Sequence, residues 1–241
     1  MIYQYNDVKI EYKFNNFVSS TPILLLHGWG CDAKIFADLI RKFPEKSFLT
    51  VDLPPFGKSG NNISDWSIFT YVNMLVSLFE HLNISQCDVL GHSFGGRLAI
   101  LLSSVQSSYV HSCILVDSAG LRPKRKFDYY LKILRYKYLK KHKKDIDNLG
   151  SKDYLALSPR LRKLFNKIVN TNLDDYCKNI NIKTLIVWGE KDKDTQFYMA
   201  KRLNKLIKKS ELKVIKNAGH YSFIEHPFEF YSLIKDFWEA L

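Results

Sequence analysis

The chain has few cysteines, and they lie far apart. Its 241 residues include only Cys31, Cys87, Cys113 and Cys177, with no C-x-x-C pair and no spacing typical of metal ligands. Three of the four lie in or beside apolar segments, where cysteine behaves as a small buried hydrophobic residue. The pattern argues against a disulfide framework and a zinc site. It predicts free thiols and, by elimination, a reducing cytoplasmic location.

Long hydrophobic runs are also missing. No apolar segment approaches the roughly 18 residues of a membrane-spanning helix. The first residues, 1–7, lack the basic and then apolar regions of a signal peptide. We therefore expect neither a transmembrane helix nor a secretory signal in this sequence. With no internal repeat or low-complexity linker, the length suits one domain with a sizeable core.

Short apolar segments alternate with longer helical patterns along most of the chain. This alternation is typical of an α/β fold with a largely parallel sheet covered by helices. Two N-terminal strands are expected to join at a turn over Asn6 and Asp7. The predicted strands are 2–5, 8–13, 23–26, 48–51, 87–90, 113–116, 184–188 and 212–215, and the main helices are 66–82, 198–208 and the segment from Pro227 to the C-terminus.

Residues 121–180 break the alternation. Apolar residues there recur at helical spacing, as at Tyr130 and Leu134, with no clear strand. The segment holds 17 Lys and Arg residues against 6 Asp and no Glu, so nearly all of the chain's net charge of +12 lies in it. We therefore predict a core domain made of residues 1–120 and 181–241, with a basic helical insertion between the two parts.

The sequence GHSFGG at residues 91–96 follows an apolar strand and precedes a helical pattern. It fits the nucleophile elbow, G-x-S-x-G, in which a sharp turn between a strand and a helix holds a serine in strained backbone geometry. Side chains at Gly91 and Gly95 would collide with the adjoining strand and helix. The pattern predicts that Ser93 is a nucleophile at the N-terminus of a helix.

A serine nucleophile needs a base, and the base works best when a carboxylate orients it. Asp192 and His220 each follow a predicted strand. Both would emerge with Ser93 at the carboxyl edge of the sheet, where open α/β sheets bind their ligands. We predict that His220 is the base and Asp192 the acid, with Asp117 and Asp194 as alternatives for the acid.

Acyl transfer also requires hydrogen-bond donors aimed at the developing oxyanion. The loop HGWG at residues 27–30 follows a buried strand and contains two glycines, which let the backbone approach closely. We predict that the backbone N–H groups of Trp29 and Phe94, the residue after the nucleophile, form the oxyanion hole. His27 and Asp52 are expected to brace the loops in which they lie.

Together these residues resemble the α/β-hydrolase superfamily over nearly the whole chain. The motifs HGWG, DLPPFGKS at 52–59, the elbow, WGEKD at 188–192 and the Gly-His pair at 219–220 follow that family's order. One departure is Pro55, where relatives usually have glycine. The resemblance implies the α/β-hydrolase fold, with residues 121–180 as a helical cap (lid) over the active site and no metal or cofactor. A serine at 93 differs from the aspartate nucleophile of haloalkane dehalogenases and epoxide hydrolases.

The resemblance is strongest to small bacterial esterase-like members of the superfamily. It implies a serine hydrolase that cleaves a carboxylic ester or thioester by two-step acyl transfer, with a small-molecule ester as substrate. Two alternatives stay open. The first is a carbon–carbon bond hydrolase, which uses similar catalytic residues. The second is a non-catalytic protein that binds a small ligand under its cap.

The charge of residues 121–180 has three interpretations. It could steer an anionic substrate, such as an ester linked to acyl carrier protein or coenzyme A. It could place the helix around residues 129–144 on an anionic membrane surface, or it could simply cover a solvated helix face. Candidates for cationic groups at the pocket are Arg122, Arg125 and Arg160. Nucleic acid is not an expected partner, because no binding motif accompanies the charge.

Overall fold

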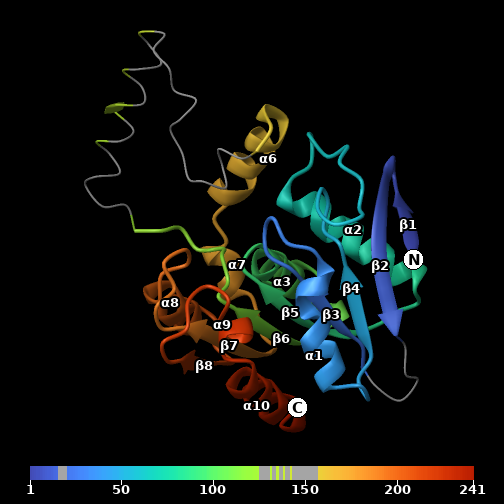
Figure 1. Ribbon diagram of the computed structural model, residues 1–241, viewed down its shortest axis with the longest axis vertical. Coiled ribbons are helices and arrows are strands. Elements are labelled where there is room, and N and C mark those ends of the chain that lie inside the picture. Colours follow the sequence, from blue (N-terminus) through green and yellow to red (C-terminus); the bar gives the residue numbers. More distant parts are fainter. Residues whose placement is uncertain (16–20, 125–130, 132–133, 136–137, 139–141, 143–156) are drawn as a thin grey trace.

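The computed structural model describes residues 1–15, 21–124, 131, 134, 135, 138, 142 and 157–241 (Figure 1). One sheet of eight strands forms the centre, in the order β1-β2-β4-β3-β5-β6-β7-β8. The strands are β1 (Ile2–Tyr5), β2 (Val8–Asn15), β3 (Ile23–Leu26), β4 (Phe48–Val51), β5 (Cys87–His92), β6 (Val110–Val116), β7 (Lys183–Gly189) and β8 (Ser210–Ile215).

The sheet is mostly parallel, as predicted. β1 and β2 form an antiparallel hairpin, and β2 pairs antiparallel with β4. Every other neighbouring pair is parallel. The hairpin turns at Asn6, whose φ of 52° is one that asparagine tolerates better than most residues. Because the parallel strands share one direction, the loops that follow β3, β5, β7 and β8 emerge at a single edge.

Helices cover both faces of the sheet (Figure 1). A larger core cluster packs α2, α3, α7 and α8 on one face, and a smaller one packs α1, α9 and α10 on the other. The helices in the described residues are η1 (Ala33–Phe36), α1 (Ala37–Lys42), α2 (Ile68–His81), α3 (Phe94–Val105), η2 (Ser107–Tyr109), α6 (Pro159–Asn170), α7 (Asp174–Lys178), α8 (Tyr198–Leu206), α9 (Ser222–Glu225) and α10 (Pro227–Glu239).

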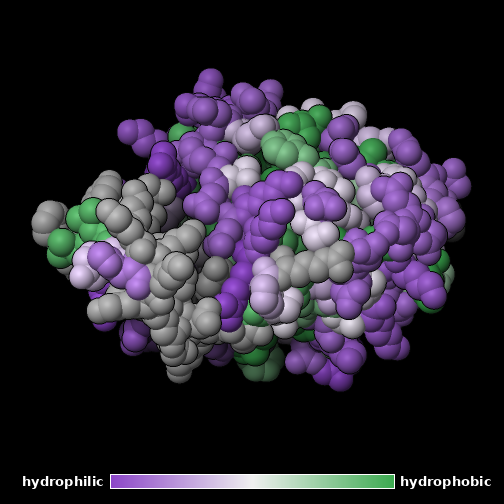
Figure 2. Space-filling view, turned by 90° about the horizontal axis from the view of Figure 1, so that it is seen from above, coloured by the Kyte–Doolittle hydropathy of each residue, from purple (hydrophilic) through white to green (hydrophobic). Residues whose placement is uncertain are grey.

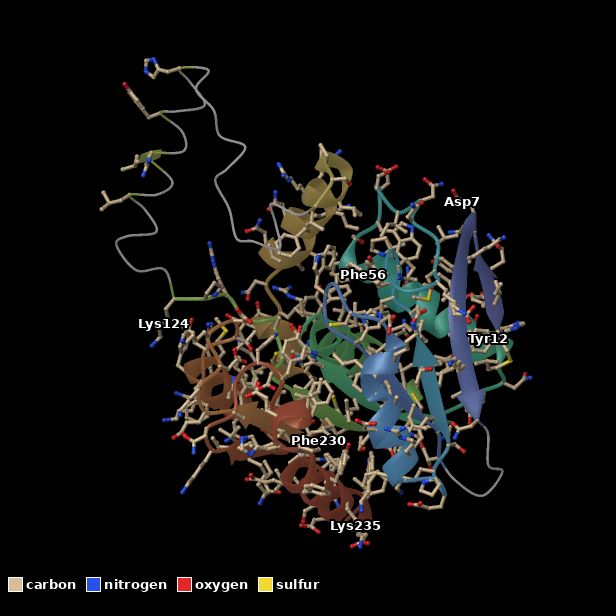
Figure 3. The ribbon with its side chains drawn as sticks, in the orientation of Figure 1. Asp7, Tyr12, Phe56, Lys124, Phe230 and Lys235 are labelled. Carbon is tan, nitrogen blue, oxygen red and sulfur yellow. The ribbon has the colours of Figure 1, made fainter. Side chains whose placement is uncertain are left out.

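Burial on both faces explains the apolar sequences of the central strands. Every residue of β3 and β4 is buried, which matches the continuous apolar runs seen in parallel strands. α2 instead has one apolar face, and it begins with a capping box between Ser67 and Thr70. Phe230 on α10 is fully buried in the smaller cluster and is labelled in Figure 3.

The predicted strand ranges agree with the structure to within a few residues. The largest difference is at β6, which starts at Val110, and β5 continues to His92. β5 therefore runs directly into the elbow. None of the described helices is long and apolar enough to cross a membrane. Seen from above, much of the described surface is hydrophilic (Figure 2).

The segment 121–180 contains α6 and α7, and its described residues form no strand. α7 packs against α3 and α8. Lys124, labelled in Figure 3, is the last residue described before position 131, and its backbone N–H donates to the Tyr198 hydroxyl at 2.8 Å. The division into a core and a cap stays a prediction.

Candidate active site

Ser93 lies at the turn between β5 and α3, in strained backbone geometry with a φ of 51° and a ψ of −109°. Such a conformation costs on the order of 1–3 kcal/mol and persists only where the surroundings enforce it. Close packing enforces it here. A Cβ on Gly91 would overlap the backbone of Gly95, and a Cβ on Gly95 would overlap the carbonyl group of Leu26. Both glycines are therefore required sterically, as the sequence predicts.

Three predicted site residues form a hydrogen-bonded chain. Ser93 Oγ lies 2.9 Å from His220 Nε2. On the other side of the ring, His220 Nδ1 lies 2.9 Å from Asp192 Oδ2. The residues come from the loops after β5, β8 and β7, which meet at the carboxyl edge of the sheet. A base within hydrogen-bond reach of a hydroxyl and oriented by a carboxylate is the arrangement that activates a serine.

The surroundings of His220 favour its protonated form. Burial by itself lowers the pKa of His220. The hydrogen bond and charge of Asp192, together with the smaller effects of the Asp117 and Asp194 charges, outweigh burial and raise that pKa above the ordinary value. Burial also acts to raise the pKa of Asp192. Hydrogen bonds from His220 and Thr195 oppose it and hold that pKa below the ordinary value. Asp192 is thus an anion suited to stabilising an imidazolium.

The two alternative acids do not contact the His220 ring. Asp194 is exposed, and its backbone N–H donates to Asp192 Oδ1 at 2.8 Å. Asp117 is fully buried and binds two loops. Its Oδ1 accepts from the Gly189 N–H at 2.7 Å, and its Oδ2 accepts from the Ser222 hydroxyl at 2.6 Å and the Ser222 N–H at 3.1 Å.

Asp117 therefore joins the start of the loop that holds Asp192 to the loop that holds His220. Burial raises the pKa of Asp117 to about 7, against the hydrogen bonds from Ser222 and Gly189. The sequence indicated a carboxylate near the imidazole at this strand end. The structure places it behind the pair, as a link between their loops.

Two further residues near His220 were not predicted from the sequence. The Thr195 hydroxyl lies 2.6 Å from Asp192 Oδ2 and 3.0 Å from the Asp117 carbonyl oxygen. His92 Nε2 donates to the His220 carbonyl oxygen at 2.8 Å. Burial lowers the pKa of His92 to about 3, so this ring is neutral. Its position directly before Ser93 was the only signal in the sequence.

The predicted oxyanion loop lies beside the elbow. Trp29 and Phe94 both line the cavity at Ser93. Within the described parts of the chain, neither backbone N–H has a hydrogen-bond acceptor. A Cβ on Gly28 would lie 2.9 Å from His92 Nδ1, so only glycine lets this loop come so close to the elbow. The geometry thus leaves two amide donors free for a substrate oxygen.

His27 and Asp52 brace loops, as predicted. His27 Nε2 accepts from the Leu53 N–H at 2.8 Å, and its Nδ1 contacts the Gly28 carbonyl oxygen at 2.8 Å. The Asp52 carboxylate accepts from the backbone N–H groups of Ala33 at 2.9 Å and Lys58 at 2.8 Å. Asp52 also lines a separate cavity of about 240 Å³ near β2 and α1, away from Ser93.

The cavity at Ser93 has a volume of about 320 Å³. Its apolar side is formed by Trp29, Phe94, Phe165, Ile168 and Val169, the last three of which lie on α6. Trp29 makes edge-to-face contacts with its aromatic neighbours, including Phe165 at 5.1 Å between ring centroids. An apolar cavity with a few polar groups at one end suits a small organic ligand.

Of the three predicted cap arginines, the structure describes the side chain of Arg122 alone. Arg122 is exposed and does not line the cavity at Ser93. Arg125 lies outside the described residues, and so does the side chain of Arg160 on α6. Among the described residues, Arg97 of α3 lines the cavity. The sequence signal for it was a single arginine in an otherwise apolar helix.

Asp192, Asp194 and His220 are close enough to offer atoms to one metal ion, since one ligand atom from each lies within 4.8 Å of the others. Of the atoms that could bind a metal, His220 Nδ1 and Asp192 Oδ2 are already hydrogen-bonded to each other. The arrangement therefore favours proton transfer along the hydrogen-bonded chain over metal ligation.

Comparison with known proteins gives a consistent family. A sequence model described as "Alpha/beta hydrolase family" matches residues 23–233. AB hydrolase superfamily protein YisY of Bacillus subtilis is 26% identical, with 90% of this chain and 91% of the relative covered. Lipase 1 of Psychrobacter immobilis is 27% identical, with 90% and 76% covered.

Two further matches extend the comparison. The pimeloyl-[acyl-carrier protein] methyl ester esterase of Neisseria meningitidis serogroup B is 24% identical, with 90% of this chain and 93% of that protein covered. A crystal structure of a bacterial membrane phospholipase A superimposes with a TM-score of 0.81 at 22% identity, covering 100% of this chain and 85% of the other. That structural likeness supports the fold.

Proposed function

Because the chain belongs to the alpha/beta hydrolase family, we propose that it is a serine hydrolase that cleaves carboxylic esters through an acyl-enzyme on Ser93. The observation that carries the proposal is the chain of hydrogen bonds from Ser93 Oγ through His220 to Asp192, both at 2.9 Å. Relatives named lipases and esterases support an enzyme that acts on ester bonds. The predicted family and fold are confirmed.

In the first step, Ser93 Oγ attacks the ester carbonyl carbon while His220 Nε2 takes the hydroxyl proton. Asp192 holds the imidazole through Nδ1 and stabilises its positive charge. The former carbonyl oxygen, now negative, accepts hydrogen bonds from the backbone N–H groups of Trp29 and Phe94. Loss of one such donor typically costs roughly 10²–10³ in turnover.

The tetrahedral intermediate then breaks down. His220 gives its proton to the leaving alcohol, and the bond between the carbonyl carbon and the alcohol oxygen breaks. In the second step a water molecule takes the place of the alcohol. His220 removes a proton from this water as the water oxygen attacks the acyl carbonyl carbon. The second tetrahedral intermediate then collapses, the bond between the acyl carbon and Ser93 Oγ breaks, and Oγ regains a proton from His220 as the acid is released.

The cavity supports an apolar acyl or alcohol group next to Ser93. We further propose that residues 121–180 form a cap over the site, since α6 supplies one side of the cavity. A carrier-linked or otherwise anionic ester fits the positive charge of this segment. The relative that acts on a pimeloyl-[acyl-carrier protein] methyl ester supports that choice for this chain.

A binding protein without catalysis has no physical need for Ser93, His220 and Asp192 in hydrogen-bond contact. No observation in the described residues favours carbon–carbon cleavage over ester cleavage. Both alternatives are therefore outcomes of the test below.

The test is hydrolysis of p-nitrophenyl esters, from acetyl to palmitoyl, by the wild type, Ser93→Ala and Ser118→Ala. Ser118 is a matched control, because its buried hydroxyl donates to the Ala119 carbonyl at 2.8 Å and lies outside the hydrogen-bonded chain. We expect Ser93→Ala to lose at least about 10⁴-fold in kcat and Ser118→Ala to stay within about threefold. Equal activity in the wild type and Ser93→Ala, or none in either, would refute the ester proposal and leave the two alternatives.

A further inference from the structure

Arg97 occupies an unusual position for a charged residue. It lies on α3, one helical turn after Ser93, and its backbone N–H donates to the Ser93 carbonyl oxygen at 3.3 Å. Only 5% of it is exposed. Charged side chains are rarely buried to this extent unless they are paired. The groups that pair with Arg97 therefore indicate its role.

The partners of Arg97 are backbone carbonyl groups at the end of α6. Nη1 donates to the carbonyl oxygens of Ile168 and Thr171, both at 2.9 Å, and Nη2 donates to that of Val169 at 3.0 Å. Within the described residues it makes no ion pair with a carboxylate. Burial lowers the pKa of Arg97 to about 10, so it stays cationic at neutral pH.

A cation at this place complements the helix end. The last carbonyl groups of a helix lack partners within the helix and hold its negative partial charge. The planar guanidinium offers several donors in a fixed geometry, so one side chain can bind three carbonyl groups at once. The Arg97 side chain thus fixes the C-terminal turn of α6 to the helix that begins at the nucleophile.

The fixed turn is also part of the cavity wall. Ile168 and Val169, whose carbonyl groups bind Arg97, line the cavity at Ser93, as does Phe165 one turn earlier. Phe165 packs edge-to-face on Trp29 of the oxyanion loop at 5.1 Å. A shift of this turn would change the width of the cavity while leaving Ser93, His220 and Asp192 in place.

We propose that Arg97 is a positioning residue that holds the C-terminal turn of α6 as the wall of the substrate cavity and so sets which ester chains fit. The proposal rests on the proposed ester hydrolysis. Arg97 makes no contact with the reacting groups through its side chain in the described structure, so its effect is on substrate fit rather than on the chemical step.

Arg202 offers a matched control. It too binds the segment 121–180, with Nη1 donating to the Arg122 carbonyl oxygen at 2.9 Å and Nη2 paired with Asp174. Its side chain is 36% exposed, and it does not line the cavity at Ser93. Loss of Arg202 therefore removes a link between the two parts of the chain without touching the cavity wall.

The experiment measures kcat and KM separately for p-nitrophenyl acetate and for the best longer ester with the wild type, Arg97→Met, Arg97→Lys and Arg202→Met. For Arg97→Met we expect KM for the longer ester to rise about tenfold, with kcat for the acetate within about threefold. Lysine keeps the charge but cannot bridge three carbonyl groups. The KM of Arg97→Lys for the longer ester should therefore lie between those of the wild type and Arg97→Met. Arg202→Met should keep the chain-length profile of the wild type.

Amide hydrogen exchange of the peptide that covers α6 gives a second readout that needs no enzyme activity. Faster exchange at α6 is expected in Arg97→Met and not in Arg202→Met. An unchanged chain-length profile in a folded Arg97→Met, or an equal change in Arg202→Met, would overturn the proposal. If Arg97→Met does not fold, an unchanged profile in Arg97→Lys overturns it. A wild type without Ser93-dependent activity would refute the ester function, while unchanged exchange at α6 would refute the role of Arg97.

Discussion

The elbow between β5 and α3 and the helix α6 face the same cavity, but they are held in different ways. Backbone contact fixes the elbow, because Gly91 and Gly95 leave no room for a Cβ against the neighbouring main chain. Side-chain contacts fix α6. Leu164 and Ile168 are buried in the larger core cluster, and Arg97 binds the last carbonyl groups of the helix.

This difference implies that one part of the molecule sets the rate of the chemical step and another sets which substrates fit. Moving Ser93 requires a change in tightly packed backbone, which a single side-chain substitution in the cavity does not cause. Moving α6 requires only a change in a few side chains. We therefore expect substitutions on the α6 side to alter which substrates fit. Substitutions in the loops after β7 and β8 should alter the rate on every substrate.

The sharpest test of the loops after β7 and β8 is the variant Asp192→Asn. The amide keeps the shape but cannot stabilise the imidazolium, so we expect kcat to fall about 10³–10⁴-fold for all esters. It should also move the pH profile. kcat/KM requires neutral His220 and falls as the pH drops through the pKa of that histidine, which in the wild type lies above the ordinary value of about 6.5. Without the Asp192 charge the midpoint should shift to lower pH.

Asp194→Asn is the matched control, two residues away and exposed. We expect its kcat to stay within about threefold of the wild type, because Asp194 is hydrogen-bonded to Asp192 only through its backbone N–H. The pH profile should move to lower pH by less than in Asp192→Asn, since the charge of Asp194 is a smaller contribution to the raised pKa of His220. A larger loss of activity in Asp194→Asn than in Asp192→Asn would show that Asp192 is not the acid.

Asp117→Asn, which changes the link between these two loops, should lower activity less than Asp192→Asn does. Asparagine has one acceptor oxygen, so it can accept hydrogen bonds from only one of the two loops that Asp117 joins. Its NH₂ group would face Gly189 or Ser222, which are themselves donors here. The loss of a charge-assisted hydrogen bond costs about 1.5–3 kcal/mol. We therefore expect a lower melting temperature and about a 10–100-fold loss in kcat. The profile of kcat/KM against pH should also shift to lower pH, since the Asp117 charge raises the pKa of His220. A wild-type melting curve and rate would contradict the link between the two loops.

On the α6 side, Phe165→Ala should change selectivity. Removing the ring opens the cavity beside Trp29, so we expect kcat/KM to rise for longer esters relative to the acetate by up to about tenfold, with little change in kcat for the acetate. Phe69→Ala is the control. Phe69 is 41% exposed and contacts Tyr176 of α7 at 6.0 Å between ring centroids, away from the cavity. Equal chain-length profiles in the two variants would contradict α6 as the cavity wall.

The smallest effect on activity is expected from a change in surface charge on α6. Lys163 on α6 is exposed, so Lys163→Glu changes the local charge by two units without altering the cavity. If the basic segment steers anionic esters, kcat/KM should fall about threefold for an ester with a carboxylate and stay constant for a neutral one, with the difference lost at high salt. Equal effects on both esters at low salt would favour a simply solvated helix face.

The sequence predicted that Ser93, Asp192 and His220 lie close together, for physical reasons. Strands of a parallel sheet end at one edge, so residues just after β5, β7 and β8 had to lie near one another. Ser93, Asp192 and His220 follow from that rule. The near neighbours Asp117 and Asp194 could not be separated, because the choice depends on loop geometry of a few ångströms.

The α6 side was predicted poorly. Charge counts showed that residues 121–180 are basic, but side-chain placement on α6 depends on contacts with distant residues such as Arg97. The contact of Arg97 with Ile168 joins residues 71 positions apart, and that of His92 with His220 joins residues 128 positions apart. No local pattern encodes such pairs. The predicted role of Arg122 at the cavity has no support, since that side chain is exposed.

The most direct test of the acyl-enzyme is covalent labelling with a p-nitrophenyl alkylphosphonate. Ser93 Oγ would attack phosphorus, form an Oγ–P bond and release p-nitrophenolate, which leaves a stable adduct. Intact-mass and peptide mass spectrometry should show one adduct per chain on the peptide that contains Ser93, and none in Ser93→Ala. An adduct on another residue, or none in a wild type that hydrolyses esters, would contradict the central claim.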